Sequence, residues 1–466
     1  MSENTLKFDL IVIGGGPAGV VGATTAASIG KKVALVEYRA ELGGAGANTG
    51  TVPSKTLRET ALALSGVRSR GLYGVDLSLR REATVADFLR HEQHVKAALN
   101  HSLSQRMEVW NTAVFCGSAT FASSHTVCVG GDKPVRLEAD YILIATGSAP
   151  ARPPGFPFGC GEIYDSDTIL ELDRLPGTMA VVGAGVIGSE YASTFAALGA
   201  KVHLIDGHNA LLPFLDAELS RALTAAMEKN GIQFHWGGRP RSYFQEESGK
   251  VALTLESGEQ LSVDAVLVAS GRKSNTETLN LAAAGVTVGD RGVIPVDASY
   301  RTNVPHIFAA GDVIGFPALA STSMQQARYA MRAAFNATAL AHPSRFLPTG
   351  VYTIPEVSMV GETEEALQHA GVEYVAGRAP YGRSARGRII GDTDGFLKLL
   401  FRRSDMRLLG VHAMGEQATE LINIGMIALM TSASVDIFDE ACFNVPTLGV
   451  LYKIAAFEAS LAAGRY

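Results

Sequence analysis

Two copies of one glycine-rich motif constrain the fold of this 466-residue chain more than any other feature. The first copy follows the apolar run Phe8–Ile13 and reads Gly14-Gly15-Gly16-Pro17-Ala18-Gly19. The second follows Met179–Val182 and reads Gly183-Ala184-Gly185-Val186-Ile187-Gly188. After each copy come residues with helical spacing, a second apolar run and an acid. This order of strand, glycine turn, helix, strand and acid predicts a dinucleotide-binding βαβ unit.

The acids, Glu37 and Asp206, follow the first glycine of their motif at the same interval. In such a unit the glycines let the backbone close on a pyrophosphate at a helix N-terminus, and the acid accepts hydrogen bonds from a ribose. A repeat of the whole unit predicts two dinucleotide sites. The expected contacts are Gly14, Gly16, Pro17, Ala18, Gly19 and Glu37 in the first, and Gly183, Gly185, Val186, Ile187, Gly188 and Asp206 in the second.

Asp206 also predicts which nicotinamide cofactor is preferred. A carboxylate accepts from the 2′-hydroxyl of NAD(H) and repels the 2′-phosphate of NADP(H). The next residues, 207–210, include no arginine or lysine to pair with a phosphate. We therefore expect a preference for NAD(H). A protonated His208 would allow some binding of NADP(H).

Length, charge and cysteine content set broad limits. The chain is too long for one core, so several domains are expected. Its net charge of -6 gives no reason to expect a nucleic acid or a membrane as partner. It has no apolar run of membrane-spanning length and no signal peptide at its start, so we expect a cytoplasmic protein. The four cysteines (116, 128, 160 and 442) have no CxxC or metal-ligand spacing and are expected to be buried, reduced thiols.

The stretch Gly43–Lys55 connects the chain to a known family. It reads Gly-Gly-Ala-Gly-Ala-Asn-Thr-Gly-Thr-Val-Pro-Ser-Lys. It resembles the FAD-dependent pyridine nucleotide–disulfide oxidoreductases, which carry G-G-x-C-x-N-x-G-C-x-P-S-K here. Aligned on Gly50 and the Pro-Ser-Lys, the two redox cysteine positions are Gly46 and Thr51. The resemblance implies a flavin site without its usual disulfide relay.

Further motifs extend this resemblance from Phe8 to about Phe457. The Ala-Thr-Gly after the strand that ends at Ile144, the Ala265–Arg272 segment and the Pro305–Asp312 segment all match family motifs. The resemblance implies that Asp312 accepts hydrogen bonds from the ribityl chain of FAD. The remaining implied contacts are Gly44, Thr51, Lys55, Ala145, Thr146, Gly147, Gly311 and Ala320 for FAD, and Gly271 for NAD.

The resemblance also implies a fold and an assembly. The fold is α/β, with two Rossmann-like dinucleotide-binding domains of the glutathione-reductase kind and an α+β C-terminal dimerisation domain. The FAD-binding domain comprises 1–150 and 276–346, the NAD-binding domain 151–275, and the interface domain 347–466. A homodimer is expected, in which the C-terminal motif of one subunit reaches the flavin of the other.

Two pairs of positions carry the implied chemistry. Family members use a C-terminal H-P-T-x-x-E, whose histidine is the base for thiol chemistry. Aligned on Pro446-Thr447, the histidine and glutamate positions are Val445 and Val450, so the base is missing together with the cysteines. Lys55 and Glu190 are the implied catalytic residues. In the family the equivalent lysine and glutamate form an ion pair beside flavin N5.

Within the family, the segments Gly50–Arg58 and Phe443–Thr447 look most like the soluble pyridine nucleotide transhydrogenases. That resemblance implies an FAD-dependent oxidoreductase that takes hydride from NAD(P)H and passes it to another pyridine nucleotide. Two alternatives remain open from the residues alone. One is an NADH-dependent diaphorase or quinone reductase with a small-molecule electron acceptor. The other is a redox-sensing flavoprotein with little turnover. A redox role of Cys442, close to the C-terminal motif, also stays open.

Overall fold

A computed structural model describes residues 5–66, 84–131, 134–159, 161–337 and 346–465. The chain divides into two compact units, each described by itself below. The first unit comprises Met1–Thr56, Leu89–Ala151 and Gly271–Pro343; the second comprises Leu57–Phe88, Arg152–Ser270 and Ser344–Tyr466. The division into three domains expected from the sequence stays a prediction.

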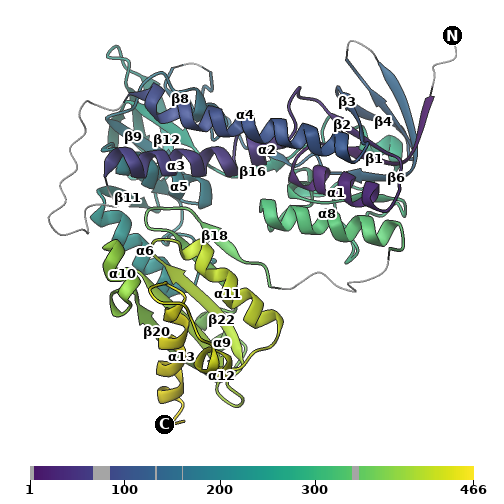
Figure 1. The fold of residues 1–466 in the computed structure, drawn as a ribbon. Coiled ribbons are helices and arrows are strands. Elements are labelled where there is room, and N and C mark those ends of the chain that lie inside the picture. Colours follow the sequence, from purple (N-terminus) through teal and green to yellow (C-terminus); the bar gives the residue numbers. More distant parts are fainter. Residues whose placement is uncertain (1–4, 67–83, 132–133, 160, 338–345, 466) are drawn as a thin grey trace. The chain divides into compact units, whose positions relative to one another are not determined.

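The first unit is built on a seven-stranded sheet of order β3-β2-β1-β6-β5-β4, in which β17 also pairs with β6 (Figure 1). β1, β2, β3, β6 and β17 run parallel, while β4 and β5 form an antiparallel edge. The strands are β1 (Thr5–Ile13), β2 (Val33–Glu37), β3 (Ala113–Cys116), β4 (Ala119–Ser123), β5 (Thr126–Val129), β6 (Val135–Ile144) and β17 (Ile307–Ala309).

The apolar run in β1 shows why this sheet lies in the interior. Its residues alternate between the two faces, as strand geometry requires. Leu10 and Val12 pack with residues of α1 (Pro17–Ser28) and α8 (Ala320–Ala334), whereas Ile11 and Ile13 pack into a second cluster on the opposite face. Both faces are therefore covered, which explains why the strand sequence is continuously apolar.

The remaining elements of the first unit lie in its connections. β7 (Ser148–Pro150) pairs antiparallel with β16 (Arg272–Ser274), where the chain leaves and re-enters the unit. α3 (Thr51–Ser65) begins in the first unit and continues into the second, and α4 (Val85–Val109) runs the other way. The short helices are α2 (Gly44–Asn48), α7 (Leu281–Ala284), η3 (Asp290–Gly292) and η4 (Asp312–Ile314).

The second unit contains a parallel sheet of order β11-β10-β9-β15-β8, which repeats the topology around the second glycine motif. A three-stranded antiparallel sheet, β12-β13-β14, is inserted in the chain between β11 and β15 of the parallel sheet. The strands are β8 (Ile163–Tyr164), β9 (Thr178–Val182), β10 (Lys201–Asp206), β11 (Ile232–Trp236), β12 (Pro240–Gln245), β13 (Val251–Leu255), β14 (Gln260–Val263) and β15 (Ala265–Val268). The helices are η2 (Thr168–Glu171), α5 (Val186–Ala197) and α6 (Ala217–Lys229).

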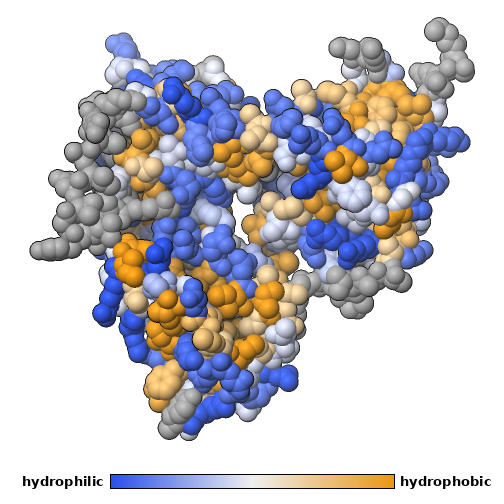
Figure 2. All heavy atoms as spheres, viewed as in Figure 1, coloured by the Kyte–Doolittle hydropathy of each residue, from blue (hydrophilic) through white to orange (hydrophobic). Residues whose placement is uncertain are grey.

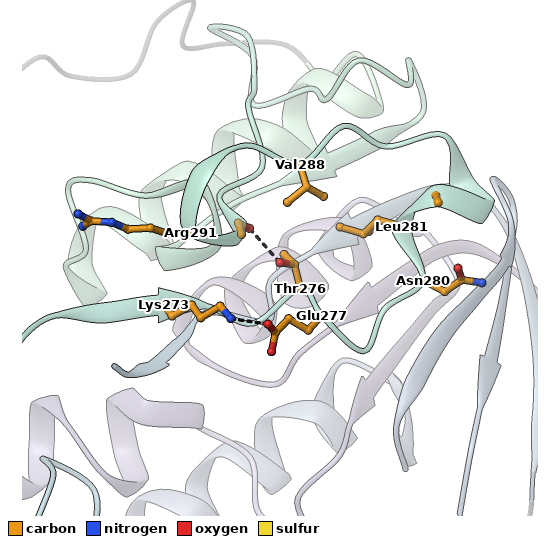
Figure 3. Close-up of a pocket in the computed structure, with 9 residues that line it drawn as sticks. Lys273, Thr276, Glu277, Asn280, Leu281, Val288 and Arg291 are labelled. Atoms are coloured by element: carbon orange, nitrogen blue, oxygen red, sulfur yellow. Dashed lines mark hydrogen bonds and ion pairs between the residues drawn. The ribbon is translucent and has the colours of Figure 1, made fainter. Parts of the chain in front are cut away.

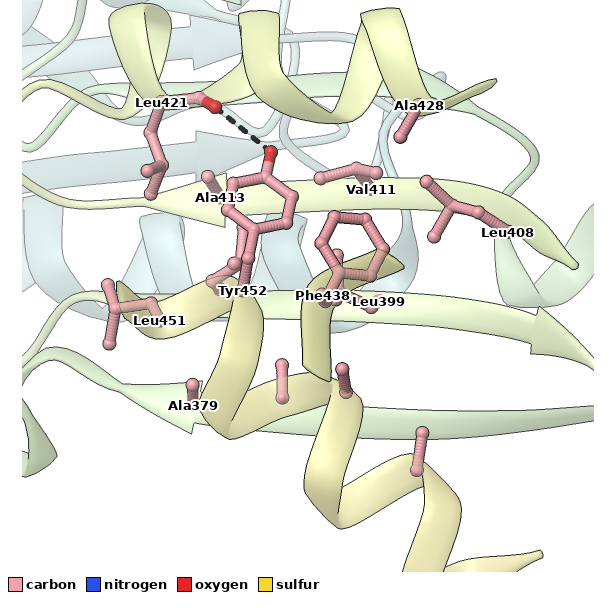
Figure 4. Packing of buried hydrophobic residues seen from close by; sticks show 14 of the residues in the cluster. Ala379, Leu399, Leu408, Val411, Ala413, Leu421, Ala428, Phe438, Leu451 and Tyr452 are labelled. Carbon is pink, nitrogen blue, oxygen red and sulfur yellow. Dashed lines mark hydrogen bonds between the residues drawn. The ribbon is translucent and has the colours of Figure 1, made fainter. Parts of the chain in front are cut away.

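The C-terminal part of this unit is an antiparallel sheet, β18-β19-β22-β21-β20, covered by helices. Tyr452 anchors its core: its hydroxyl donates to the carbonyl oxygen of Leu421 at 2.9 Å, and its ring stacks on Phe438 (Figure 4). The strands are β18 (Thr349–Val351), β19 (Val357–Gly361), β20 (Tyr374–Pro380), β21 (Phe396–Arg402) and β22 (Leu408–Met414). The helices are α9 (Glu364–His369), η5 (Tyr381–Arg383), α10 (Ala385–Ile390), α11 (Ala418–Met430), α12 (Asp436–Glu440) and α13 (Val450–Ala462).

A buried charge cluster connects α6 to this antiparallel sheet. Lys398 of β21, with 1% of its side chain exposed, contacts Asp216 at 2.6 Å, Glu364 at 2.7 Å and Glu218 at 3.0 Å. Arg378 of β20 adds a second cation and pairs with Glu218 and Glu364. No sequence pattern indicated these residues, because partners far apart in the chain meet only through the fold.

Candidate dinucleotide sites

The first glycine motif forms a tight turn between β1 and α1. Gly14 has φ +103°, and a Cβ atom there would lie 2.4 Å from the carbonyl oxygen of Ala145. A Cβ at Gly19 would lie 1.7 Å from the carbonyl oxygen of Gly14, so only glycine lets the helix approach the strand this closely. Gly16 is the N-cap of α1 and provides no side-chain cap. The first-turn amides of α1 are therefore free to bind an anion.

Glu37, at the end of β2, holds this turn in place. Its Oε2 accepts from the amide of Gly15 at 2.7 Å and its Oε1 from the amide of Arg39 at 3.0 Å. The side chain is buried, and each carboxylate oxygen keeps a further lone pair. This arrangement positions a carboxylate beside the turn, as a ribose-binding acid requires.

The carboxyl ends of β6 and β17 bring other expected FAD residues to the same edge of the sheet. Thr146, just past β6, has a buried hydroxyl oxygen with no hydrogen-bond partner among the described residues. Asp312 accepts from the hydroxyl of Ser148 at 2.7 Å, and Arg272 donates to that hydroxyl at 2.7 Å. Gly311, with φ +83°, precedes Asp312, and its amide donates to Gln326 of α8. An orphan hydroxyl and a half-exposed carboxylate at one edge fit a polar ligand there.

The loop with the missing cysteines packs directly on the first turn. Gly44 begins α2 with φ +50°, and a Cβ there would lie 2.9 Å from Cα of Gly16. A Cβ at Gly46 would lie 2.6 Å from Cγ of Pro17. Thr51 is exposed and begins α3, and Lys55 lies one turn further on, 3.2 Å from the hydroxyl of Ser54. The loop is therefore shaped for small residues against the turn.

The second motif repeats the geometry of the first. A Cβ at Gly183, where φ is +106°, would lie 2.5 Å from the carbonyl oxygen of Ala269, and one at Gly188 would lie 1.8 Å from that of Gly183. Gly185 is the N-cap of α5 without a side-chain cap, and a Cβ there would meet nothing within 4 Å. Val186 and Ile187 begin the helix. Open space before uncapped amides suits a pyrophosphate.

Asp206 ends β10 and has the role that Glu37 has in the first unit. Its Oδ2 accepts from the amide of Ala184 at 2.6 Å, and its Oδ1 accepts from the amide and Nδ1 of His208 at 2.8 and 2.7 Å. Burial opposes ionisation, but the hydrogen bonds from His208 and Ala184 hold the pKa of Asp206 below its usual value. The group is therefore a carboxylate at neutral pH.

Four expected residues lie elsewhere than in these two glycine turns. Glu190 of α5 is buried in the second unit, and its Oε1 accepts from the amide of Tyr352 at 3.0 Å. Lys55 belongs to the first unit, so its pairing with Glu190 stays a prediction. Gly271 begins a segment of the first unit, not of the unit that holds the second motif. Ala320 is the first residue of α8, whose N-terminus, like those of α1 and α5, has no side-chain cap.

The expected burial of the cysteines was wrong for the residues that the structure describes. Cys116 and Cys442 are exposed and Cys128 is half-buried, all three as free thiols, while Cys160 lies outside the described residues. Cys116 was misjudged because alternate residues of the edge strand β3 face solvent. In the C-terminal motif Val445 is 65% exposed, and within the described ranges no group of three or more metal-ligating side chains occurs.

A pocket of about 550 Å³ in the first unit lies apart from all expected contacts (Figure 3). Lys273 and Glu277 form an ion pair across its rim, so its lysine is already neutralised. Leu281 and Val288 line its apolar side. None of its lining residues was expected from the sequence, and it is not the candidate site.

The two glycine turns, each with a helix N-terminus and an acidic residue hydrogen-bonded to the turn, define a class of protein: an α/β oxidoreductase with two dinucleotide sites. A family model described as pyridine nucleotide-disulphide oxidoreductase matches residues 8–334, and its dimerisation domain matches 347–455. The chain therefore belongs to the pyridine nucleotide-disulphide oxidoreductases. It is an FAD-dependent NAD(P)H oxidoreductase, as the sequence predicted.

Named relatives agree with this assignment. A soluble pyridine nucleotide transhydrogenase of Mycobacterium bovis is 42% identical over 459 residues, which is 97% of each chain. Among solved structures, LpdA of Mycobacterium tuberculosis superposes with a TM-score of 0.90 at 25% identity, covering 97% of this chain and 99% of that one. The HOCl-induced flavoprotein disulfide reductase RclA of Escherichia coli gives 0.88 at 27% identity, with the same coverage. These matches confirm the expected fold class.

The dimerisation domain presents an apolar surface. Figure 2 shows hydrophobic side chains gathered over the part of the second unit that carries α11 and α13. The exposed members are Ile424, Ile427 and Met430 on α11, and Phe457 and Leu461 on α13. Exposed apolar residues in such number mark an interaction surface. Within the described ranges, every helix is too short or too polar to cross a bilayer.

Proposed function

We propose that the protein transfers hydride from one pyridine nucleotide to another through FAD, without a protein disulfide. The observation that carries this proposal is Gly46, which stands at the first redox cysteine position with Pro17 2.6 Å from where its Cβ would be. Relatives named soluble pyridine nucleotide transhydrogenase support the same reading. We further propose a homodimer. The cytoplasmic location stays a prediction.

FAD supplies the redox chemistry when bound, because it accepts a hydride and gives it up again. The residues of the chain hold and orient the cofactors. The N-termini of α1 and α5 bind pyrophosphates, Glu37 and Asp206 bind riboses, and Asp312 receives the ribityl chain. We propose that Lys55 and Glu190 form an ion pair whose fixed cation stabilises negative charge on the cofactor. Neither Thr51 nor Val445 offers a thiol or a base.

The test is an acceptor screen on purified, FAD-loaded protein. Under anaerobic conditions NADH is mixed with a thionicotinamide analogue of NADP⁺, a quinone or a dye, and the rates are compared. Fastest turnover with the pyridine nucleotide analogue supports the proposal. Fastest turnover with the quinone or dye makes the protein a diaphorase or quinone reductase. Turnover with every acceptor no faster than oxygen consumption favours a sensor.

We expect kcat/KM to be higher with NADH than with NADPH as the reductant. The reason is Asp206, which is ionised at neutral pH and repels a 2′-phosphate while it accepts from a 2′-hydroxyl. The Asp206→Asn variant removes the charge and should narrow the difference between the two reductants. Steady-state kinetics with both reductants and a common dye measure this. Higher kcat/KM with NADPH in the unaltered protein would show that another residue controls selectivity.

Replacing Lys55 by methionine is expected to slow reduction of the bound flavin by NADH about 10²-fold, since one preorganised charge is lost. The flavin midpoint potential should fall at the same time. Lys7→Met is the matched control, because Lys7 is exposed on β1 and pairs only across the surface with Glu138. Stopped-flow absorbance and a redox titration measure the two quantities. Unchanged rate and potential in Lys55→Met would rule out the proposed role.

A further inference from the structure

The surroundings of Asp206 include a cation that the local sequence does not reveal. Arg239 follows β11 by three residues, and its side chain lies across Gly207, the residue after Asp206. A Cβ at Gly207 would lie 2.7 Å from Nε of Arg239, 3.2 Å from Nη2 and 3.3 Å from Cζ. The guanidinium therefore lies beside the Gly207 backbone, and a larger residue at 207 would push it away from this position.

Two glycines bring Arg239 to this place. Gly237 has φ +66°, and its amide donates to the carbonyl oxygen of His208 at 3.3 Å. Gly238 is buried, and a Cβ there would lie 3.6 Å from Cγ2 of Ile205 and 3.1 Å from the carbonyl oxygen of His235. The turn after β11 is thus closed onto the end of β10. Strands β10 and β11 are hydrogen-bonded neighbours, which sets the two carboxyl ends side by side.

The backbone of Arg239 is anchored on its other side as well. Its carbonyl oxygen accepts from the amide of Glu256 at 2.9 Å, which ties it to the turn after β13. The side chain is exposed, and within the described ranges it forms no ion pair with any carboxylate. Its five N–H donors are therefore available to a ligand. A planar guanidinium is the group best suited to bind a phosphate through two hydrogen bonds.

We propose that Arg239 is the residue that binds the 2′-phosphate of NADP(H) at the second dinucleotide site. The inference rests on the proposed function, since a transhydrogenase must accept both nucleotides. Asp206 continues to favour the free 2′-hydroxyl, and Arg239 offsets its repulsion of a phosphate. One site then binds NAD(H) and NADP(H), with the preference set by a carboxylate and a cation that come from different strands.

The test measures binding without redox turnover. Adenosine 2′,5′-bisphosphate and 5′-AMP differ only in the 2′-phosphate, and their affinities for the FAD-loaded protein are measured by isothermal titration calorimetry. Arg239→Ala is expected to weaken binding of the bisphosphate roughly 10-fold and to leave 5′-AMP unchanged, the loss of one exposed charge-assisted contact. High salt should shrink the difference, because the contact is exposed.

Two further variants and a control sharpen the result. Gly207→Ala leaves Arg239 in the chain but places a Cβ in the path of its guanidinium, so it should weaken the bisphosphate alone. Arg239→Lys keeps a point charge and should retain part of the affinity. Arg241→Ala, at another exposed arginine two residues further on, should change the affinity of neither ligand. All variants are first checked for full FAD content and an unchanged melting temperature, which report an intact fold.

Equal weakening of both ligands by Arg239→Ala, or no weakening of either, would overturn the assignment. The outcome is separate from that of the proposed function. If the unaltered protein fails to reduce the NADP⁺ analogue but Arg239→Ala loses only affinity for the bisphosphate, the phosphate site is supported and the transhydrogenase activity is not. A protein that transfers hydride normally in Arg239→Ala keeps the activity and binds the phosphate elsewhere.

Discussion

Replacing Lys398 by methionine is expected to destabilise the second unit by about 3–5 kcal/mol, because the change leaves buried carboxylates without their cation. The Lys398 ammonium contacts three acids, and one of them, Asp216, is fully buried. Burial alone would lower the pKa of Lys398, but hydrogen bonds to Asp216 and Glu364 outweigh it and raise that pKa. The lysine is therefore charged in the folded protein, and removing it breaks a network.

Lys229 provides a matched control for this substitution. It pairs with Asp394 at 2.8 Å, but its side chain is 74% exposed and that of Asp394 72%. Lys229→Met removes the same charge from the same unit and should leave the melting temperature nearly unchanged, because an exposed ion pair is screened by solvent. Thermal unfolding of the FAD-loaded variants, followed by calorimetry, compares the two. Equal melting temperatures would show that the buried cluster contributes no more than a surface pair.

The same cluster makes the second unit sensitive to acid. Burial raises the pKa values of Asp216, Glu218 and Glu364, but their contacts with Lys398 and neighbouring groups hold them below their usual values. Carboxylates with depressed pKa values stabilise the fold above their unfolded pKa, and that stability is lost as the pH falls through the folded value. The cluster should therefore weaken on acidification, when its carboxylates take up protons, and again at strongly alkaline pH, when Lys398, whose pKa is raised by the same contacts, loses its proton.

His412, fully buried beside this cluster, acts in the same direction. Burial lowers its pKa from 6.5 to about 4, while its Nε2–H donates to the carbonyl oxygen of Glu362 at 3.0 Å. The unfolded chain binds a proton between these two values and the folded chain does not, so stability falls as the pH drops from about 6.5 toward 4. Melting temperatures at pH 7, 5.5 and 4 measure the loss, which His412→Gln should reduce.

The elements that carry a strong local pattern could be predicted from the sequence. The two glycine turns, the strands around them and the acids Glu37 and Asp206 lie where spacing placed them, because a tight turn on a helix N-terminus tolerates few other residues. The absence of the redox cysteines could also be predicted from the sequence, since the loop around their positions keeps its other motif residues. Local chemistry determines all of these features.

The contacts that depend on tertiary neighbours could not be predicted. The residues after Asp206 suggested that no cation lies near a 2′-phosphate, yet Arg239 comes from the turn after the adjacent strand. Lys398 is the one charged residue among the apolar residues 396–401, and only the fold places Asp216 beside it. Cys116 was expected to be buried like the other cysteines, but an edge strand exposes alternate residues. Each of these depends on which strands become neighbours.

One equivalent of NADH, added without oxygen, is expected to bleach the bound flavin and to produce no long-wavelength thiolate band. In disulfide reductases that band arises when a thiolate stacks on the oxidised flavin. Here Gly46 and Thr51 have no sulfur, and Val445 and Val450 cannot act as the base. Glutathione disulfide and lipoamide should consequently not be reduced, and thiol-blocking reagents should not slow turnover. Absorbance spectra and NADH consumption with each substrate measure these outcomes.

Restoring both cysteines should not restore the disulfide relay. This experiment distinguishes a loop whose shape has changed from a loop that has lost only its two sulfur atoms. Thr51→Cys places a thiol at an exposed helix start and should be tolerated with full FAD content. Gly46→Cys must move Pro17, whose Cγ lies 2.6 Å from the new Cβ, and Pro17 begins the helix whose N-terminus is proposed to bind the FAD pyrophosphate. The double variant is therefore expected to bind less FAD, because Pro17 is displaced. A double variant that keeps its FAD, forms the disulfide and shows the thiolate band would mean that the loop can still house a relay, and that hydride transfer between nucleotides does not follow from its shape.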